Sequence, residues 1–312
     1  MYFKDKTIKG KKYKYAVKSF RLPSGDVKVL EKIYKGESQK ELEKIFDEKL
    51  EKEHISYMIK NFKTDSIFNK QQFEKIERIR LNYSKILKRL SKASFKDLLD
   101  RFTANFTYES NALEGNSLTL KDVAIVMFEK TSIKGKDLRE IYETRNSRDI
   151  IELIFKNKFK LSHEDIIKMH KMLVKDLDID IGYKRFPNIL VGKRVELTSP
   201  EKVYEKMDEL LKWIRENPDR LHPIKLAAVS HGKFEKIHPF QDGNGRIGRF
   251  LINVILMQNK YPPLIIRKSQ RVAYLTSLEK FDAGHTDTLE RFILEKFKDT
   301  YSKFFEIYVK YL

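Results

Sequence analysis

The sequence predicts a mainly α-helical protein, a helical bundle that carries two small β-hairpins. Apolar residues recur every three or four positions over most of the chain, as they do from Phe73 to Leu90, and this spacing gives a helix one apolar face. Capping residues such as Thr119 and Ser162 precede several of these segments. Strand-like patterns are found in residues 1–35 and 182–198.

Composition narrows the class of protein. The chain has 312 residues, of which 41% are hydrophobic and 35% charged, so it can bury a sizeable core beneath a well-solvated surface. It contains no cysteine, which excludes disulfides, zinc–thiolate sites and thiol nucleophiles. It has no long apolar run and does not open with a signal peptide. We therefore expect a cytoplasmic protein with no membrane partner.

The net charge of the chain is +19, a value that in some proteins reflects binding to nucleic acids or anionic surfaces. Here the lysines are spread over many predicted helices, and no known nucleic-acid-binding motif is present. We therefore favour a lysine-rich surface over a nucleic-acid partner.

Residues 1–93 are predicted to form an extension that precedes a main domain at 94–312. Apolar residues alternate with polar ones on both sides of a turn at Pro23–Asp26, namely Tyr13, Tyr15 and Val17 before it and Val27 and Val29 after it. This alternation predicts a β-hairpin, to which the sequence assigns no function. Two charged amphipathic helices are expected to follow, at 40–62 and 71–90.

The main domain is predicted to be a series of helices, most of them opened by a capping residue or a proline. Ser94, with Asp97 three residues later, is expected to cap the first helix, which should end near Leu113, before Gly115. Further helices are expected at 119–130, 138–157, 162–175, 199–217, 223–237 and 289–312. Between two of them, residues 189–191 and 195–197 flank a Gly-Lys-Arg turn and predict the second hairpin.

The segment from His238 to Arg249 concentrates most of the candidate functional residues and reads HPFQDGNGRIGR. An apolar helical run follows it, so we expect a loop held at the start of a buried helix. The segment also contains the GxGxxG pattern of dinucleotide-binding folds. That pattern requires a preceding strand, whereas a helical run precedes it here, and we reject this interpretation.

The residue types in this segment suit a nucleotide. The turn Gly243-Asn244-Gly245 can direct backbone N–H groups at one point, and a helix N-terminus attracts anions. Arg246 and Arg249 are three residues apart, on one side of the helix, where guanidiniums can bind phosphate oxygens in pairs.

Two further side chains suit catalysis. His238 accepts a proton readily near neutral pH. Asp242 is a hard oxygen ligand of the kind that Mg²⁺ uses together with substrate phosphates. His231, seven residues before His238, could form a metal pair with it, but metalloprotease spacing and a third nearby ligand are both missing, so we expect a structural role. His170 is expected to form hydrogen bonds in the core.

These twelve residues resemble the signature of the Fic family, HxFx(D/E)GNGRxxR, at every fixed position, and the resemblance extends over about residues 94–292. It implies a Fic-fold helical bundle that transfers AMP from ATP to a Ser, Thr or Tyr hydroxyl of a target protein. It also implies that His238 deprotonates the hydroxyl and that Asp242 holds Mg²⁺. The turn Gly243–Gly245 and Arg246 would hold the phosphates, and Arg249 would bind the γ-phosphate.

The stretch Ser110–Gly115 is an ordinary helix end by spacing alone, with Glu114 as an exposed carboxylate. It resembles the inhibitory motif (S/T)xxxE(G/N) that one class of the family carries before its core. The resemblance implies an inhibitory helix at about 95–114, in which Ser110 and Glu114 belong to the motif. Glu114 would then pair with Arg249 and repel ATP from the γ-phosphate site.

The resemblance also implies how a target docks. In the family the mid-chain hairpin is a flap that receives the target segment, which here places Ile189, Leu190 and Val191 at an edge able to add a peptide strand. Tyr274 lies where the family has an adenine-side helix, and a packed core tyrosine is an equal alternative. The target is an unidentified protein or the chain itself, and a homodimer is expected only by family likeness.

Two alternative functions remain open. The same residues could run the reverse reaction, in which Glu114 orients a water and the protein removes AMP from a modified target. A basic nucleic-acid-binding or scaffold protein with a degenerate nucleotide site is the alternative outside enzymes, and it predicts salt-sensitive DNA binding.

Overall fold

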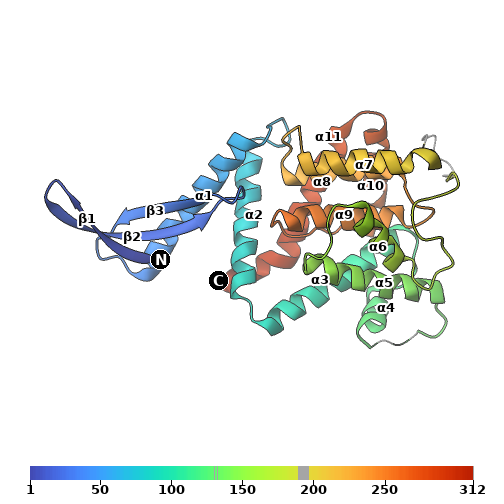
Figure 1. The fold of residues 1–312 in the computed structure, drawn as a ribbon. Helices are drawn as coiled ribbons and strands as arrows, with labels where there is room; N and C mark the ends of the chain where they lie inside the picture. The colour runs from blue at the N-terminus through green and yellow to red at the C-terminus, as the bar shows by residue number, and fades with distance from the viewer. Residues whose placement is uncertain (130, 132, 189–196, 312) are drawn as a thin grey trace. The chain divides into compact units, whose positions relative to one another are not determined.

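The computed structural model describes residues 1–129, 131, 133–188 and 197–311. These residues form two compact units, Met1–Leu81 and Asn82–Leu312 (Figure 1). The flap residues Ile189, Leu190 and Val191 lie outside the described residues.

The first unit begins with a three-stranded antiparallel sheet in the order β1-β2-β3. The strands are β1 (Tyr2–Ile8), β2 (Lys11–Arg21) and β3 (Val27–Ile33). The predicted hairpin is β2–β3, which pairs Arg21 with Val27 across the expected turn. Strand β1 was not predicted, because the polar run KDKT in its middle hides the apolar alternation that marks a strand.

Two helices follow the sheet close to their predicted positions, α1 (Gln39–Asn61) and α2 (Lys70–Arg89). Helix α1 begins with a capping box, in which Ser38 and Glu41 each bind the other's backbone N–H. One core cluster joins β2 to α1 through Ala16, Leu42 and Phe46. The helical period of α1 therefore buries one stripe against the sheet.

The second unit is helical in its described part. Its elements are α3 (Lys92–Leu113), α4 (Leu120–Ala124), the π-turn η1 (Ile125–Glu129), α5 (Leu138–Phe155), α6 (His163–Leu173), α7 (Pro200–Glu216), α8 (Pro223–Ile237), α9 (Asn244–Gln258), the 3₁₀ turn η2 (Lys268–Gln270), α10 (Arg271–Asp282), α11 (Thr286–Thr300), the π-turn η3 (Tyr301–Phe305) and the 3₁₀ turn η4 (Glu306–Tyr311).

Helix α9 is the centre of this unit. It contacts α3, α5, α6 and α8, and Figure 1 shows it between these helices. Most of its residues are buried, including the polar Asn244, Arg246, Arg249 and Asn253. Polar groups buried this deeply need hydrogen-bond partners. Polar side chains and backbone groups of neighbouring segments therefore gather around the N-terminal half of α9.

The helix boundaries agree with the predictions except in three places. The helix predicted at 119–130 ends at Ala124 and gives way to the π-helix η1. Helix α3 begins at Lys92 because Ser91 caps it and accepts a bond from the Ser94 N–H at 3.1 Å, so the prediction that Ser94 is the cap was wrong. The predicted helix at 289–312 instead begins at Thr286 and gives way after Thr300 to a π-turn and a 3₁₀ turn.

No helix in the described ranges combines the length and the hydrophobicity that a membrane span requires.

Candidate functional site

The predicted loop and helix are both present. Helix α8 ends at Ile237, and its C-cap residue, His238, adopts a left-handed conformation with φ 49° and ψ 61°. Helix α9 begins after Gly243, which has φ 83°. Phe240 is fully buried and stacks on His170 at 4.0 Å between ring centroids. Asn244 closes the loop, because its Oδ1 accepts from the Phe240 N–H at 2.9 Å and its Nδ2 donates to the Phe240 carbonyl at 2.7 Å.

Two residues before the flap add contacts that the sequence did not predict. The Lys184 N–H donates to the carbonyl of Pro239 at 2.8 Å. Asn188 Nδ2 donates to the carbonyls of Phe240 and Gln241 at 3.1 and 3.0 Å. Backbone bonds of this kind fix the loop from outside its own sequence, so no local pattern in the motif could reveal them.

The imidazole of His238 is half-buried and lies 3.3 Å, by Nδ1, from the carbonyl oxygen of Glu235. A carbonyl oxygen can only accept a hydrogen bond, so this contact places the ring proton on Nδ1. The Nε2 atom then carries the lone pair, which is the arrangement that a general base requires.

A cavity of about 320 Å³ lies at the N-terminus of α9. Its walls bring together most of the predicted site residues and two from outside the motif: Glu114, Asn188, His238, Gln241, Asp242, Gly243, Asn244, Gly245 and Arg246. No side chain caps the N-terminus of α9 at Gly243. The first-turn N–H groups therefore favour an anion in this cavity.

The guanidinium of Arg249 is buried and is held by the end of α3. Its Nε donates to Ser110 Oγ and its Nη2 donates to the Ser110 carbonyl, both at 2.9 Å. Nη2 also lies 2.7 Å from Glu114 Oε1, so the ion pair expected from the sequence is present. Burial alone would raise the pKa of Glu114, but the charge and the hydrogen bond of Arg249 outweigh it and leave that pKa lowered.

The contact between Glu114 and α9 depends on Gly245. A Cβ atom at Gly245 would lie 2.3 Å from Glu114 Oε1 and 3.0 Å from Arg249 Nη1. A glycine therefore lets the carboxylate approach the helix N-terminus, where the helix dipole also favours a negative charge.

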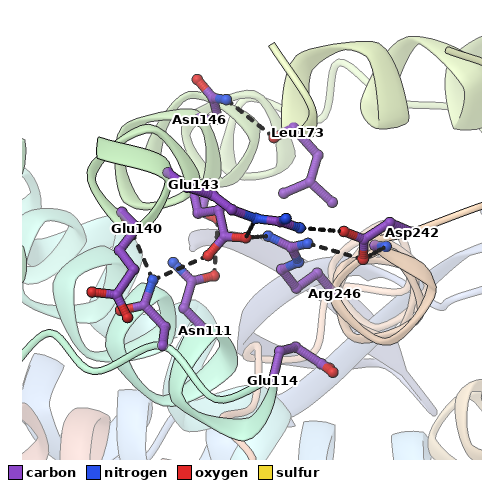
Figure 2. A network of polar contacts seen from close by, with 12 residues as sticks. Asn111, Glu114, Glu140, Glu143, Asn146, Leu173, Asp242 and Arg246 are labelled. Atoms are coloured by element: carbon purple, nitrogen blue, oxygen red, sulfur yellow. Dashed lines mark hydrogen bonds and ion pairs between the residues drawn. The ribbon is translucent and has the colours of Figure 1, made fainter. Parts of the chain in front are cut away.

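The carboxylate of Asp242 has partners on two elements (Figure 2). Its Oδ1 accepts from the Gly243 N–H at 2.5 Å and lies 3.4 Å from Arg246 Nη2. Its Oδ2 accepts from Arg139 Nη2, on α5, at 2.7 Å. Glu143, also on α5, lies 3.1 Å by Oε1 from Arg246 Nη1. Arg139 and Glu143 were not predicted, and their only sequence signal is the i,i+4 spacing of an ordinary helix pair.

The residues present fit a magnesium ion that arrives with a nucleotide. Asp242 places one carboxylate at the cavity wall. Within the described residues, no group of three or more His, Cys, Asp or Glu side chains is placed to hold a metal ion. Magnesium commonly takes one or two carboxylates and completes its shell with waters and phosphate oxygens.

The remaining sequence candidates lie deeper in the fold. Tyr274 is 2% exposed, and its hydroxyl lies 2.8 Å from His231 Nε2. Its ring centroid is 6.0 Å from Arg249 Cζ, so the tyrosine borders the buried guanidinium. His170 is fully buried, and its Nε2 lies 3.2 Å from the Asp242 carbonyl, in keeping with the structural role expected for it.

The sequence is similar to known adenylyltransferases over part of its length. Protein adenylyltransferase Fic of Nematostella vectensis is 33% identical over 192 residues, covering 60% of this chain and 45% of that protein. Protein adenylyltransferase fic-1 of Caenorhabditis briggsae is 31% identical over 195 residues, covering 60% of this chain and 38% of that protein. The chain thus matches less than half the length of these relatives.

Solved structures share the fold. A Fic domain containing signalling protein from Bacteroides thetaiotaomicron aligns with a TM-score of 0.67 and 25% identity, over 73% of this chain and 94% of that one. Fic-1 from C. elegans aligns with a TM-score of 0.64 and 24% identity, over 74% of this chain and 70% of that one.

The central helix of this bundle begins after a glycine turn and carries two buried guanidiniums, those of Arg246 and Arg249. Residues 160–256 of this chain match the Fic/DOC family model. The predicted fold class, a Fic-fold helical bundle, is therefore confirmed.

Proposed function

We propose that this protein is a protein adenylyltransferase, which transfers AMP from ATP to a hydroxyl side chain of a target protein. The named activity of its relatives supports the proposal. The observation that carries it is the shared cavity, in which His238 faces the same space as the glycine turn and Arg246. A general base and an anion-binding helix end are thus within reach of one ligand.

In the proposed reaction, the target hydroxyl oxygen attacks the α-phosphorus of ATP. The new O–P bond forms as the bond between the α-phosphorus and the bridging oxygen breaks, and pyrophosphate leaves. His238 Nε2 takes the hydroxyl proton. The amides of Gly243–Gly245 and the guanidinium of Arg246 stabilise charge on the phosphates. Magnesium bound by Asp242 and the phosphates would neutralise further charge.

Glu114 is proposed to inhibit this reaction. Its carboxylate borders the cavity and pairs with Arg249, the guanidinium expected to bind the γ-phosphate. The lowered pKa of Glu114 keeps the carboxylate charged at neutral pH, so it repels a triphosphate at short range. Relief requires Glu114 to move away from Arg249.

The proposal is tested by incubating the protein with ATP, Mg²⁺ and a cell lysate, and by searching tryptic peptides for a covalent AMP group by mass spectrometry. Both the unaltered chain and the Glu114→Gly variant are used, with His238→Ala as the blank. AMP-modified Ser, Thr or Tyr in the variant, on lysate proteins or on the chain itself, supports the proposal. Equal modification with His238→Ala overturns the mechanism.

The reverse reaction is a second candidate, because Glu114 and His238 lie on the walls of the same cavity. A carboxylate there could orient a water against the phosphorus of an AMP-modified side chain. Mixing the protein with AMP-modified substrate and measuring free AMP tests this. Release that disappears in Glu114→Gly would support removal of AMP, and no release from the unaltered chain would exclude it.

A further inference from the structure

Four charged side chains at the site form a closed ring of alternating sign. Arg139 Nη2 lies 2.7 Å from Asp242 Oδ2, and Asp242 Oδ1 lies 3.4 Å from Arg246 Nη2. Arg246 Nη1 lies 3.1 Å from Glu143 Oε1, which lies 3.4 Å from Arg139 Nε. Two residues come from α5 and two from the signature segment. Figure 2 shows Glu143 and Asp242 on either side of Arg246.

The ring satisfies Asp242 without a metal. Both carboxylate oxygens accept bonds, and two positive charges surround one negative one. A divalent cation beside this carboxylate would meet two guanidiniums at short range, which is repulsive. A cation can therefore bind Asp242 only after one guanidinium withdraws.

The exposure of the two arginines decides which one withdraws. The Arg139 side chain is 56% exposed, whereas that of Arg246 is 3% exposed. A guanidinium at the surface can exchange its partner for water at little cost, but a buried one would lose its partners without replacement. Arg139 is therefore the member that can leave.

Glu143 holds Arg246 when the ring opens. Its Oε1 contacts Arg246, and its Oε2 accepts from Asn116 Nδ2 at 3.1 Å. The carboxylate is thus fixed from both sides and is 12% exposed. When Asp242 turns to a metal, Glu143 keeps Arg246 in position and retains its compensating charge.

We propose that Arg139 is a built-in counter-ion of the metal site, which the magnesium–nucleotide complex must displace from Asp242. This proposal rests on the proposed function, in which Asp242 binds that complex. Arg139 thereby raises the magnesium concentration needed for nucleotide binding, and Glu143 positions Arg246 throughout.

The test measures binding, so it does not depend on turnover. The dissociation constant of α,β-methylene-ATP, which cannot release AMP, is measured by calorimetry over a series of Mg²⁺ concentrations at constant ionic strength. All proteins carry Glu114→Gly, so that the proposed inhibitory side chain is absent. The comparison is between Arg139→Gln and the parent.

Arg145→Gln is the matched control. Arg145 lies on the same helix and forms an ion pair with Asp176, with its side chain 46% exposed. The two substitutions therefore remove the same charge from the same helix. Asp242→Asn is included to test the metal ligand itself.

Arg139→Gln is expected to lower the half-saturating Mg²⁺ concentration about threefold, in line with the small worth of an exposed ion pair. Arg145→Gln should stay within about 1.5-fold of the parent, because Arg145 pairs with Asp176 and not with a member of the ring, and exposed charges are screened by salt. The Arg139 effect should shrink as salt is raised.

Each other outcome has one meaning. If Arg139→Gln matches the parent while Asp242→Asn removes the Mg²⁺ dependence, the counter-ion role is wrong and the proposed function stands. If Arg145→Gln lowers the Mg²⁺ requirement as much as Arg139→Gln does, net charge is responsible and the counter-ion role is again wrong. If Asp242→Asn leaves the Mg²⁺ dependence intact, the metal assignment in the proposed function fails as well.

Discussion

Glu114 Oε1 lies 2.7 Å from Nη2 of Arg249, a residue 135 positions further along the chain. The two partners differ in exposure, because the Arg249 side chain is 3% exposed and that of Glu114 is 44% exposed. Arg249 also binds Ser110 through two separate nitrogens. The guanidinium would therefore keep its position if Glu114 were removed, and the carboxylate is the side chain that can move.

Replacing Glu114 by glycine should release the site. In Glu114→Gly, Arg249 keeps its two bonds to Ser110 and becomes able to bind a γ-phosphate. Because the Glu114–Arg249 pair is partly exposed, we take its free-energy contribution against ATP binding as about 1.4 kcal/mol. Its loss corresponds to about a tenfold rise in AMP incorporation. Scintillation counting of protein incubated with α-labelled ATP measures this rise.

A second variant separates charge from size at this position. Glu114→Gln keeps the shape of the side chain and an acceptor for Arg249, but it removes the negative charge. The AMP incorporation measured with Glu114→Gln should be higher than that of the unaltered chain and lower than that of Glu114→Gly. If Glu114→Gly labels no faster than the unaltered chain, Glu114 is not inhibitory.

His238→Ala should abolish transfer and leave nucleotide binding intact. Loss of a general base lowers rates by about 10²- to 10⁴-fold. The groups proposed to bind phosphate lie in the glycine turn and the first turn of α9, and none of them is part of the imidazole. Made in the Glu114→Gly background, the variant should bind α,β-methylene-ATP within about twofold of its parent while losing AMP transfer, because a base contributes to the transition state and not to uniform binding. Unchanged transfer would remove His238 from the mechanism.

The local structure of the signature segment was predictable from sequence because the segment is contiguous. The end of α8, the loop and the first turn of α9 lie between His238 and Arg249, and glycine, asparagine and arginine there have definite conformational and hydrogen-bonding preferences. The Thr119 and Ser162 caps were predictable for the same reason, since each cap bonds within its own turn.

The long-range pairs were less predictable. Spacing alone indicated an exposed carboxylate at Glu114, and only the family resemblance suggested Arg249 as its partner. Arg139 lies 103 residues from Asp242, and nothing in the helix around it marks it for the site. Tertiary packing brings these residues together, and one sequence does not record which helix faces meet. Ser94 was the wrong cap because α3 begins three residues earlier than predicted, after Ser91, and sequence patterns place helix ends only to within a few residues.

Stability should depend on pH through His231. Burial first and then the charge of Arg249 lower its pKa to about 3, against about 6.5 in the unfolded chain. The unfolded state therefore binds a proton at this residue more readily than the folded state does. The contribution of His231 to the free energy of unfolding is constant above about pH 7 and falls as the pH drops from about 6.5 toward 3. Between pH 7 and 5 the loss from this residue should be about 2 kcal/mol.

Urea unfolding of the unaltered chain and of His231→Gln at pH 7 and pH 5 measures this loss. Glutamine does not titrate and can still bond to the Tyr274 hydroxyl, the partner of His231 Nε2. The variant should lose less stability on acidification than the unaltered chain. Other titrating groups, including His170, are common to both proteins and cancel. Identical losses would show that His231 is protonated in the folded protein.

The effect of Gly245→Ala on the free energy of unfolding should change sign with the residue at position 114. With Glu114 present, the new methyl group would lie 2.3 Å from Oε1. The side chain must then move, which lengthens its bond to Arg249. With Glu114→Gly that contact disappears, and only the milder 3.0 Å approach to Arg249 Nη1 remains. Gly245 also lies in the first turn of α9, where alanine is favoured over glycine by up to about 1 kcal/mol.

A double-mutant cycle on the free energy of unfolding measures this coupling. The two substitutions touch the same contact, so their effects should depart from additivity by about 0.5–3 kcal/mol. Gly245→Ala should destabilise the chain that retains Glu114 and should be neutral or stabilising in the chain that lacks it. Additive effects would mean that Glu114 does not rest against α9 in solution, and the contact proposed to hold the enzyme inactive would then have no basis.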